Sequence, residues 1–339
     1  MILHVFNADN DMALANGEPG YTPPASIQKM MQQTALLPTR WAAQGDGVLT
    51  ADGVWVVDKA LFPRQELEDA VFDPWTNSIE PGAGHYISIA EALPLISEVR
   101  PWGWSPAVCH RLRCVGVADS LLPDAARLAE IRRLSSRERA VEMLPRLTAL
   151  DERLVGESMF CTTFTVVQDA MAQWPRAILK APWSSSGKGI RYSQGGREDT
   201  LSGWCQRIIR SQGGVVVEPL YDKLHDFAME FWSDGQGNVE YRGLSVFATH
   251  PNGAYAGNRL WTESHKMAWL CQYADEALVA RLRQALEWLL GQLIGQTYRG
   301  PLGVDMMLLP DGCMHPCVEI NLRMTMGYAS LLIPKQLIS

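Results

Sequence analysis

The sequence lacks the features that mark secreted, membrane-spanning and nucleic-acid-binding proteins. No apolar run approaches the length needed to cross a bilayer, and the first residues have neither a basic segment nor a long apolar one. Cysteine is scarce, with 7 scattered in 339 residues, which is typical of reduced thiols and not of a disulfide framework. The net charge of -7 argues against a general nucleic-acid binder, although a local basic cluster can still bind an anion. We therefore expect a cytoplasmic protein that binds neither membranes nor nucleic acids.

Internal repeats, low-complexity tracts and long linkers are also absent, so the 339 residues are expected to form two or three packed domains. A helical pattern of apolar residues ends at Leu134, and we expect a domain boundary close to Ser135. The chain opens with a short apolar run, Ile2 to Phe6, that ends in the polar group Asn7 to Asp11. Open α/β sheets bind ligands at the carboxyl ends of their strands, although a solvated turn would explain the same pattern.

The richest pattern lies where two β-type runs flank the turn Pro310-Asp311-Gly312. If the runs pair as a hairpin centred on Gly312, Asp305 lies directly opposite Glu319, with the two Cβ atoms about 4.5 to 5.5 Å apart. Asn321 follows Glu319 by two positions and therefore shares its face. Three oxygen ligands on one face suit Mg²⁺. The alternative is an accidental register with solvated carboxylates, because a slip of one residue would separate them.

A second pattern is a loop rich in small residues between two strands. The strands are expected over Ala177 to Ala181 and Ile190 to Tyr192, with Ser184 to Gly189 between them. Small residues let backbone N–H groups approach an anion, and Lys188 adds positive charge. The loop is not a P-loop, because GxxxxGK[ST] is absent and the flanks indicate strand, loop, strand. A flexible hairpin tip is the alternative.

Alternating patterns predict further strands between the loop and the hairpin. Val215 to Leu220 is expected to be a strand that contains Glu218. Asp226 to Trp232 also alternates, which places Asp226 and Glu230 on the same face. Elements expected elsewhere are a strand over Thr162 to Val167 and helices over Gln168 to Trp174 and Ala274 to Thr297.

Three potential zinc ligands lie in the second run of the hairpin. Cys313, His315 and Cys317 alternate and would share one strand face. Their spacing is not that of a zinc knuckle and no second pair follows, so we favour the oxygen ligands.

The order and spacing of these pieces resemble the ATP-grasp superfamily, whose members hold ATP between two α+β subdomains. The resemblance covers about residues 135–328, and its most specific parts are Ile178-Leu179-Lys180 with Ser184 to Gly189, and Asp305 with Val318 to Arg323. It implies an ATP-grasp fold with a small or lid subdomain at 135–218 and a C-terminal catalytic subdomain at 219–339. Residues 1–134 fit the N-terminal α/β domain that usually precedes such a core.

The resemblance implies roles in nucleotide binding. Lys180 would contact ATP near the α-phosphate and adenine, and the loop would close over the β- and γ-phosphates. Glu218 and Leu220 would read adenine through backbone groups, and Asp226 or Glu230 would lie near the ribose or the base. Arg137 stands where family members often carry a phosphate-contacting Lys, with a surface helix charge as the alternative. The implied nucleotide-binding residues are Arg137, Lys180, Ser184, Ser185, Ser186, Gly187, Lys188, Gly189, Glu218, Leu220, Asp226 and Glu230.

The resemblance also implies metal ligands and catalytic residues. Asp305, Glu319 and Asn321 would bind one or two Mg²⁺ ions, with Mn²⁺ as a substitute. Arg323 would face the transferred phosphoryl group, with Lys188 as a second catalytic residue. Two positions depart from the family pattern: Leu322 stands where a Pro is frequent, and Gly303 stands where some amide ligases have an Arg.

The implied activity is that of an ATP- and Mg²⁺-dependent ligase. A substrate carboxylate would be activated as an acylphosphate and attacked by an amine, with release of ADP and phosphate; amino acids or short peptides are the implied substrates. The alternatives are a nucleotide-binding protein without ligase activity and a kinase-like enzyme that stops at phosphorylation. A homodimer is the default expectation for the oligomeric state.

Overall fold

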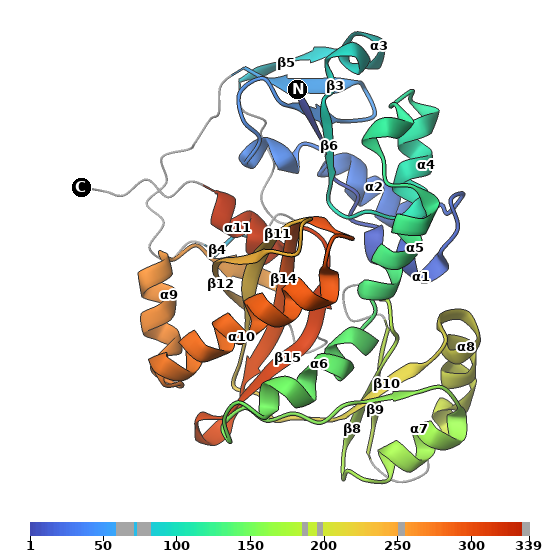
Figure 1. Cartoon of the computed structure of the whole chain (residues 1–339). Helices are drawn as coiled ribbons and strands as arrows, with labels where there is room; N and C mark the ends of the chain where they lie inside the picture. The colour runs from blue at the N-terminus through green and yellow to red at the C-terminus, as the bar shows by residue number, and fades with distance from the viewer. Residues whose placement is uncertain (59–70, 73–82, 185–188, 195–198, 250–254, 334–339) are drawn as a thin grey trace.

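The computed structural model of the chain describes residues 1–58, 71–72, 83–184, 189–194, 199–249 and 255–333 (Figure 1). Within these residues the strands form three sheets, of five, four and six strands. The five-stranded sheet lies at the top of Figure 1, the four-stranded sheet at the lower right, and the six-stranded sheet between them and to the left.

The five-stranded sheet belongs to the N-terminal part of the chain. Its strands are, in spatial order, β5 (Gly84–Ile87), β3 (Val54–Val57), β2 (Gly47–Leu49), β1 (Ile2–Val5) and β6 (Glu98–Pro101). β1 pairs in parallel with β2 and β6, as in an α/β domain, so the predicted first strand is confirmed. The helices of this part are α1 (Asn10–Asn16), α2 (Ala25–Gln33), α3 (Ile89–Ala92), α4 (Pro106–Cys114) and α5 (Ala125–Leu134).

The four-stranded sheet contains the predicted hairpin with the small-residue loop. Its order is β7 (Met159–Cys161), β10 (Val215–Pro219), β8 (Ala177–Lys180) and β9 (Ile190–Ser193), and all neighbours are antiparallel. Helices α7 (Phe164–Met171) and α8 (Ser202–Gln212) pack against it, with Val167, Cys205 and Val217 in one apolar cluster. β8 and β9 pair directly, which confirms the predicted strand, loop, strand order.

One predicted strand is wrong. Thr162 to Val167 was expected to be extended because it is rich in β-branched residues, but α7 begins at Phe164. The Thr163 side chain accepts a hydrogen bond from the Val166 N–H and caps this helix. Val167, Ala170 and Met171 then share the buried face of α7, so tertiary packing outweighs the strand propensity of Thr and Val.

The six-stranded sheet forms the centre of the molecule. Its order is β15 (Met314–Asn321), β14 (Arg299–Leu308), β11 (His225–Asp234), β12 (Val239–Thr249), β13 (Tyr255–Arg259) and β4 (Val71–Phe72). The helices in this part are α6 (Glu138–Thr148), α9 (Glu263–Leu270), α10 (Glu276–Ile294) and α11 (Met326–Leu332). β4 comes from the N-terminal part of the chain and extends this sheet beyond β13.

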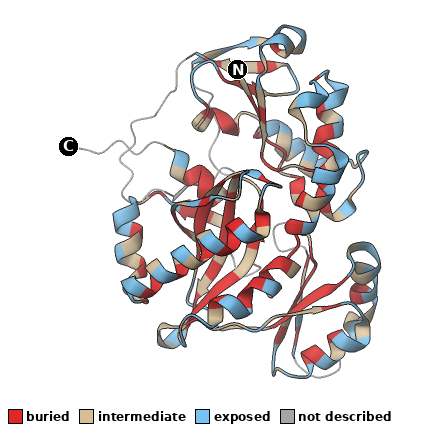
Figure 2. Cartoon of the chain, in the orientation of Figure 1, coloured by how far each residue is buried: buried red, intermediate tan, exposed pale blue. Residues whose placement is uncertain are grey.

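The two faces of the six-stranded sheet differ because side chains alternate along each strand. Phe227, Phe231 and Val304 lie on the face covered by α10 and α6, where Leu282 and Leu286 of α10 join the same buried cluster (Figures 1 and 2). The opposite face is polar and is the starting point for the candidate site.

Candidate active site

Two carboxylates face each other across strands β14 and β15. Asp305 pairs with Glu319, and Gly303 pairs with Asn321, so the predicted opposition of the two acids is confirmed. The Asn321 Nδ2 atom donates a hydrogen bond to Oδ2 of Asp305 at 3.0 Å, which joins the third oxygen-bearing side chain to the pair. The three side chains therefore gather on one face of the sheet.

The register that achieves this opposition is not uniform. A hairpin centred on Gly312 would pair Leu308 with Pro316, but Leu308 pairs with Met314, and the ladder shifts between Asp305 and Met307. Pro316 lies in the irregular stretch, where its missing N–H costs no ladder hydrogen bond. The predicted constant register is thus wrong near the turn. A bulge shifts the pairing by the residues needed to place Asp305 opposite Glu319, as predicted.

The electrostatics of this pair suit a bound cation. Burial and the facing Glu319 carboxylate raise the pKa of Asp305 to about 7. Arg137 supplies positive charge beside Glu319: its Nη2 atom lies 2.8 Å from Oε2 of Glu319. Two carboxylate groups and an amide oxygen are hard ligands of the kind Mg²⁺ takes in proteins, so the residues present fit the ion.

Arg137 links the acids to the edge of the small-residue loop. Its Nη1 atom donates to the Ala181 carbonyl at 2.6 Å and to Oγ of Ser184 at 2.8 Å. The residue is only 7% exposed, so its interpretation as a surface charge is wrong. This single guanidinium therefore connects the four-stranded sheet with β15 of the six-stranded sheet.

Lys180 and Glu218 form a buried ion pair in the four-stranded sheet. The Lys180 Nζ atom lies 2.6 Å from Oε2 of Glu218, and Ser158 donates to the other carboxylate oxygen at 3.2 Å. The backbone N–H of Leu220 donates to the Arg176 carbonyl at 3.0 Å. In this conformation the Leu220 N–H already donates a hydrogen bond to protein. It could donate to adenine only if this bond to the Arg176 carbonyl broke.

Arg323 is held by Asp11, from the N-terminal part of the chain. Its Nε and Nη2 atoms each lie 2.8 Å from an oxygen of Asp11, in a two-bond pairing. Burial opposes the charged form, but the Asp11 carboxylate outweighs it, and the pKa of Arg323 is raised above its ordinary value. Asp9 is fully buried and pairs with Arg111, so Asn7 to Asp11 is not a solvated turn. Sequence reasoning missed the Asp11–Arg323 pair, because more than 300 residues separate its members and no local signal joins them.

Asp226 and Glu230 alternate along β11 on the same face as Asp305. Asp226 interacts with Lys223 and accepts a hydrogen bond from Thr249 Oγ1 at 2.8 Å. Glu230 is 1% exposed, and burial raises its pKa to about 8. The two acids therefore differ in environment, with Asp226 already paired and Glu230 without an ion-pair partner among the described residues.

Most of the predicted site residues meet around one cavity of about 410 Å³. Ser185, Ser186, Gly187 and Lys188 lie outside the described residues. Gly189 is described but does not line the cavity; a Cβ at this position would lie 2.2 Å from Cβ of Ser184, so the close packing requires glycine. The predicted site residues that line the cavity are Arg137, Lys180, Ser184, Glu218, Leu220, Asp226, Glu230, Asp305, Glu319, Asn321 and Arg323.

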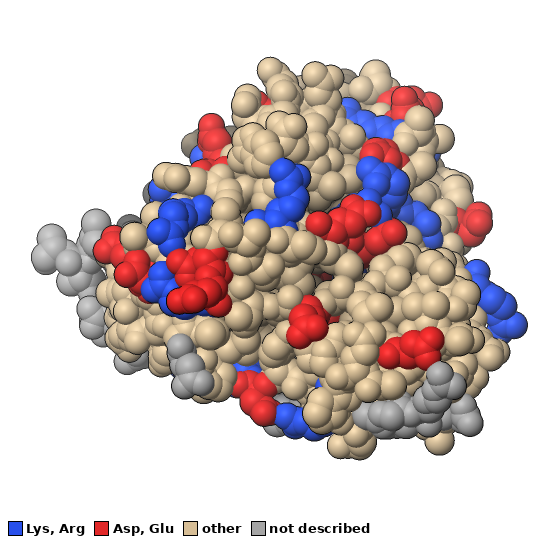
Figure 3. Space-filling model, turned by 60° about the horizontal axis from the view of Figure 1, so that its bottom comes forward, with Lys and Arg blue, Asp and Glu red and all other residues tan. Residues whose placement is uncertain are grey.

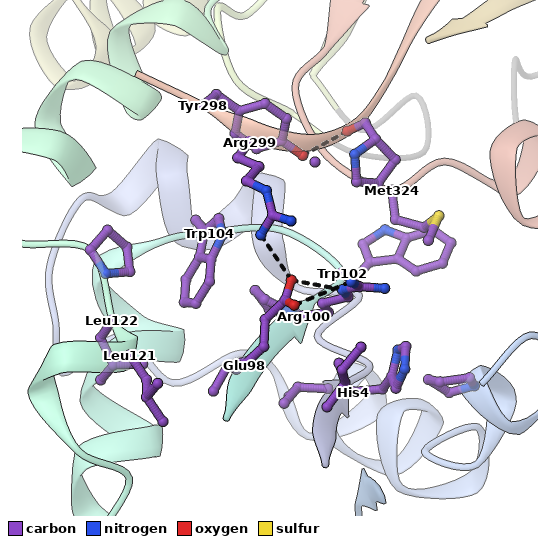
Figure 4. Close-up of a pocket in the computed structure, with 18 of the residues that line it drawn as sticks. His4, Glu98, Arg100, Trp102, Trp104, Leu121, Leu122, Tyr298, Arg299 and Met324 are labelled. Atoms are coloured by element: carbon purple, nitrogen blue, oxygen red, sulfur yellow. Dashed lines mark hydrogen bonds and ion pairs between the residues drawn. The ribbon is translucent and has the colours of Figure 1, made fainter. Parts of the chain in front are cut away.

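A second cavity, of about 530 Å³, lies between β6 and the start of β14 (Figure 4). Its walls include several aromatic side chains, among them Trp102 and Trp104. Of its acids, Glu98 is paired with Arg100 at 2.9 Å and with Arg299 at 3.2 Å, and Asp46 lies 3.4 Å from the His4 ring. A carboxylate that already faces two arginines is a poor ligand for a divalent cation, so we place the chemistry at the other cavity.

The zinc alternative receives no support. The described residues contain no group of three or more His, Cys, Asp and Glu side chains that could bind a metal ion together. His315 and Cys317 are buried on β15, and the irregular stretch at Pro316 interrupts the alternation on which the alternative depended.

The surface carries charges of both signs. On the face shown in Figure 3, Lys and Arg side chains lie beside Asp and Glu side chains. Among the described residues, no helix is both long enough and apolar enough to cross a membrane.

Comparison with known proteins gives the following relatives. No family model matches the chain. The butirosin acyl-carrier-protein L-glutamate ligase of Niallia circulans is 26% identical over 216 residues, which are 61% of this chain and 46% of that enzyme. The chain thus spans about half the length of this curated relative.

Among solved structures, D-alanyl-alanine synthetase A from Vibrio cholerae matches with a TM-score of 0.45 at 13% identity, covering 97% of this chain and 90% of that chain. The biotin carboxylase of Campylobacter jejuni matches with a TM-score of 0.47 at 15% identity, covering 72% and 52%. Within the described residues a five-stranded sheet with parallel pairs is followed along the chain by a four-stranded antiparallel sheet and a six-stranded sheet, so the predicted mixed α/β and α+β class is confirmed.

Proposed function

We propose that the chain is an ATP-dependent ligase that activates a carboxylate as an acylphosphate and joins it to an amine. The observation that supports this most directly is the Asp305, Glu319 and Asn321 cluster, which opens on the same cavity as Lys180 and Arg323. Transfer of the γ-phosphoryl group requires acidic side chains that bind a divalent cation and positively charged side chains that bind phosphate. The two sheets supply both kinds.

Each group has a separate task in this proposal. Mg²⁺ or Mn²⁺, as one or two ions bound by the three oxygen-bearing side chains, would neutralise and orient the phosphates. Lys180 contacts the nucleotide from the four-stranded sheet, and Arg323, fixed by Asp11, faces the phosphoryl group in transfer. Arg137 now pairs with Glu319, and it would be available to the phosphates once a cation took its place as the partner of that acid.

The carboxylate and the acceptor are proposed from the relative and from the family resemblance. The relative is named as a ligase of L-glutamate and an acyl-carrier protein, so L-glutamate is the first carboxylate to test. Free amino acids and short peptides are the proposed acceptors, and an acceptor attached to a carrier protein is the alternative. The enzyme would act in the cytoplasm as a homodimer and without nucleic acid.

The test is ADP release from ATP and Mg²⁺ in a matrix of carboxylates and amines, with product mass measured in each well. A ligase gives ADP together with a product that has lost water relative to its two substrates. ATP binding without ADP release would favour the binding protein, and a phosphorylated product that persists with every amine would favour the kinase-like enzyme. Glu240→Gln is a matched control, since Glu240 is an exposed acid on β12, outside the cavity.

A further inference from the structure

A buried acid extends the polar face of the six-stranded sheet beyond the metal ligands. Glu230 pairs with Gly303, and Gly303 pairs with Asn321, so these three positions form one row across β11, β14 and β15. Asp305 is a diagonal neighbour of Glu230 on the same face, at a separation of about 7 to 8 Å. Glu230 therefore lies one step along the sheet from the acids that face the phosphates.

Two glycines make room for this carboxylate. A Cβ on Gly303 would lie 2.6 Å from Oε2 of Glu230, and a Cβ on Gly327 would lie 2.0 Å from Oε1. Either substitution would displace the acid from its place. The space beside Glu230 thus depends on the absence of side chains at both positions.

The described side chains that contact Glu230 are uncharged and polar, while the charges of Asp305, Lys266 and Arg323 act on it from nearby. Thr325 donates the hydrogen bond that the carboxylate accepts, at 2.9 Å, and Asn258 donates to Ser245 at 2.6 Å next to it. Glu230, Ser245, Asn258 and Thr325 all line the same cavity as Asp305, and we call this end of the cavity the Glu230 recess.

Lys266 and Arg323 lie near enough to act on the charge of Glu230, and each also contacts another group. Arg323 is paired with Asp11, and Lys266 donates to the Leu244 carbonyl at 2.6 Å. Within the described residues no ion pair is formed by Glu230, although it is 1% exposed. Burial disfavours the charged form of this acid, and a ligand that brings a positive charge into the recess favours the ionised carboxylate.

Building on the ligase function proposed above, we propose that the Glu230 recess binds the amino nitrogen of the acceptor as its ammonium form. The acid, the hydroxyls of Ser245 and Thr325 and the amide of Asn258 offer oxygen acceptors to an ammonium group. Their position next to the metal ligands places that nitrogen beside the activated carboxylate. The ammonium group passes one proton to the Glu230 carboxylate, and the neutral amine then attacks the acyl carbon as phosphate leaves. The recess thus selects amines that bind as cations over nucleophiles that bind uncharged.

The test compares a charged amine with a neutral nucleophile in wild type and Glu230→Gln. L-glutamate is the carboxylate, methylammonium is the amine probe, and hydroxylamine, which is mostly neutral near pH 7.5, traps the acylphosphate as a hydroxamate. We expect Glu230→Gln to raise KM for methylammonium by roughly 10-fold or more, and by a larger factor than it changes hydroxamate formation. Glu230→Asp, which keeps the charge, should restore most of the amine affinity.

The outcomes separate the two proposals. No hydroxamate from the wild-type protein with any carboxylate of the matrix overturns the ligase function and the recess with it. Normal hydroxamate formation, with the same KM for methylammonium in wild type and Glu230→Gln, overturns the recess alone. Thermal melting of both variants identifies a folding defect, and Glu230→Asp then serves as the decisive variant.

Discussion

The two faces of the six-stranded sheet are built from the same strands and have opposite composition. Along β11, Phe227 and Phe231 point into the core beneath α10, while Asp226 and Glu230 point into the cavity. β14 repeats this alternation, with Val304 on the core side and Asp305 on the cavity side. The side chains on one face thus stabilise the fold by burial. Those on the other face line the cavity and need not contribute to stability.

The polar face works against stability by itself. The raised pKa values of Asp305, about 7, and Glu230, about 8, mean that the folded protein disfavours their charged forms. Ligands that supply positive charge recover this free energy on binding. Variants on the two faces should therefore separate activity from stability.

The largest effect is expected from Glu319→Gln on the polar face. Because the variant removes one of two facing acids, turnover should fall by about 10²- to 10³-fold or more, as for loss of a preorganised charge. The melting temperature should stay close to that of the wild type, since repulsion with Asp305 is relieved as the Arg137 pair is lost. ADP release and calorimetry measure the two quantities, with Glu240→Gln as control. Full activity in Glu319→Gln would show that Glu319 is not a metal ligand.

The matching variant on the apolar face is Phe231→Ala. It leaves a cavity among the buried side chains beneath α10 and should lower the free energy of unfolding by about 3 to 5 kcal/mol. Urea denaturation measures this loss. Activity per folded molecule should change little at low temperature, because Phe231 does not line the active cavity. If Phe231→Ala lowered activity without lowering the free energy of unfolding, the proposed difference between the two faces would be wrong.

A smaller effect is expected from the pH dependence of stability. Burial raises the pKa of Glu230 from 4.5 to about 8, so the folded state keeps a proton that the unfolded state loses between these pH values. The stabilising contribution is complete below pH 4.5 and is lost as pH rises toward 8. Glu230→Gln has no such group, so its stability relative to wild type should rise by on the order of 3 kcal/mol between pH 5 and 8. Denaturation at several pH values tests this, and parallel pH profiles for the two proteins would contradict it.

The smallest effect is expected from Arg137→Met, which removes the link between the polar face and the four-stranded sheet. We expect ATP to bind roughly 10-fold more weakly, because a charge-assisted contact to phosphate is lost. Titration calorimetry with ATP and Mg²⁺ measures the change. Unaltered affinity would mean that Arg137 stays with Glu319 when the nucleotide binds.

The sequence was sufficient for features that depend on local periodicity. Alternation along 303–309 and 315–323 was enough to oppose Asp305 and Glu319, and the strands around the small-residue loop followed from their apolar runs. The bulge was not predictable, because a constant register explains the same alternation. The α7 helix was missed since packing, and not propensity, decides it. The pairing of Asp11 with Arg323 joins residues from the two ends of the sequence, which no local pattern encodes.

The central claim is that Asp305, Glu319 and Asn321 bind the metal that presents ATP. Anomalous diffraction from crystals grown with Mn²⁺ and a non-hydrolysable ATP analogue tests it most directly. We expect a manganese peak about 2 Å from oxygen atoms of these side chains and in contact with the β- and γ-phosphates. A peak elsewhere in the molecule, with the nucleotide phosphates distant from β14 and β15, would contradict it.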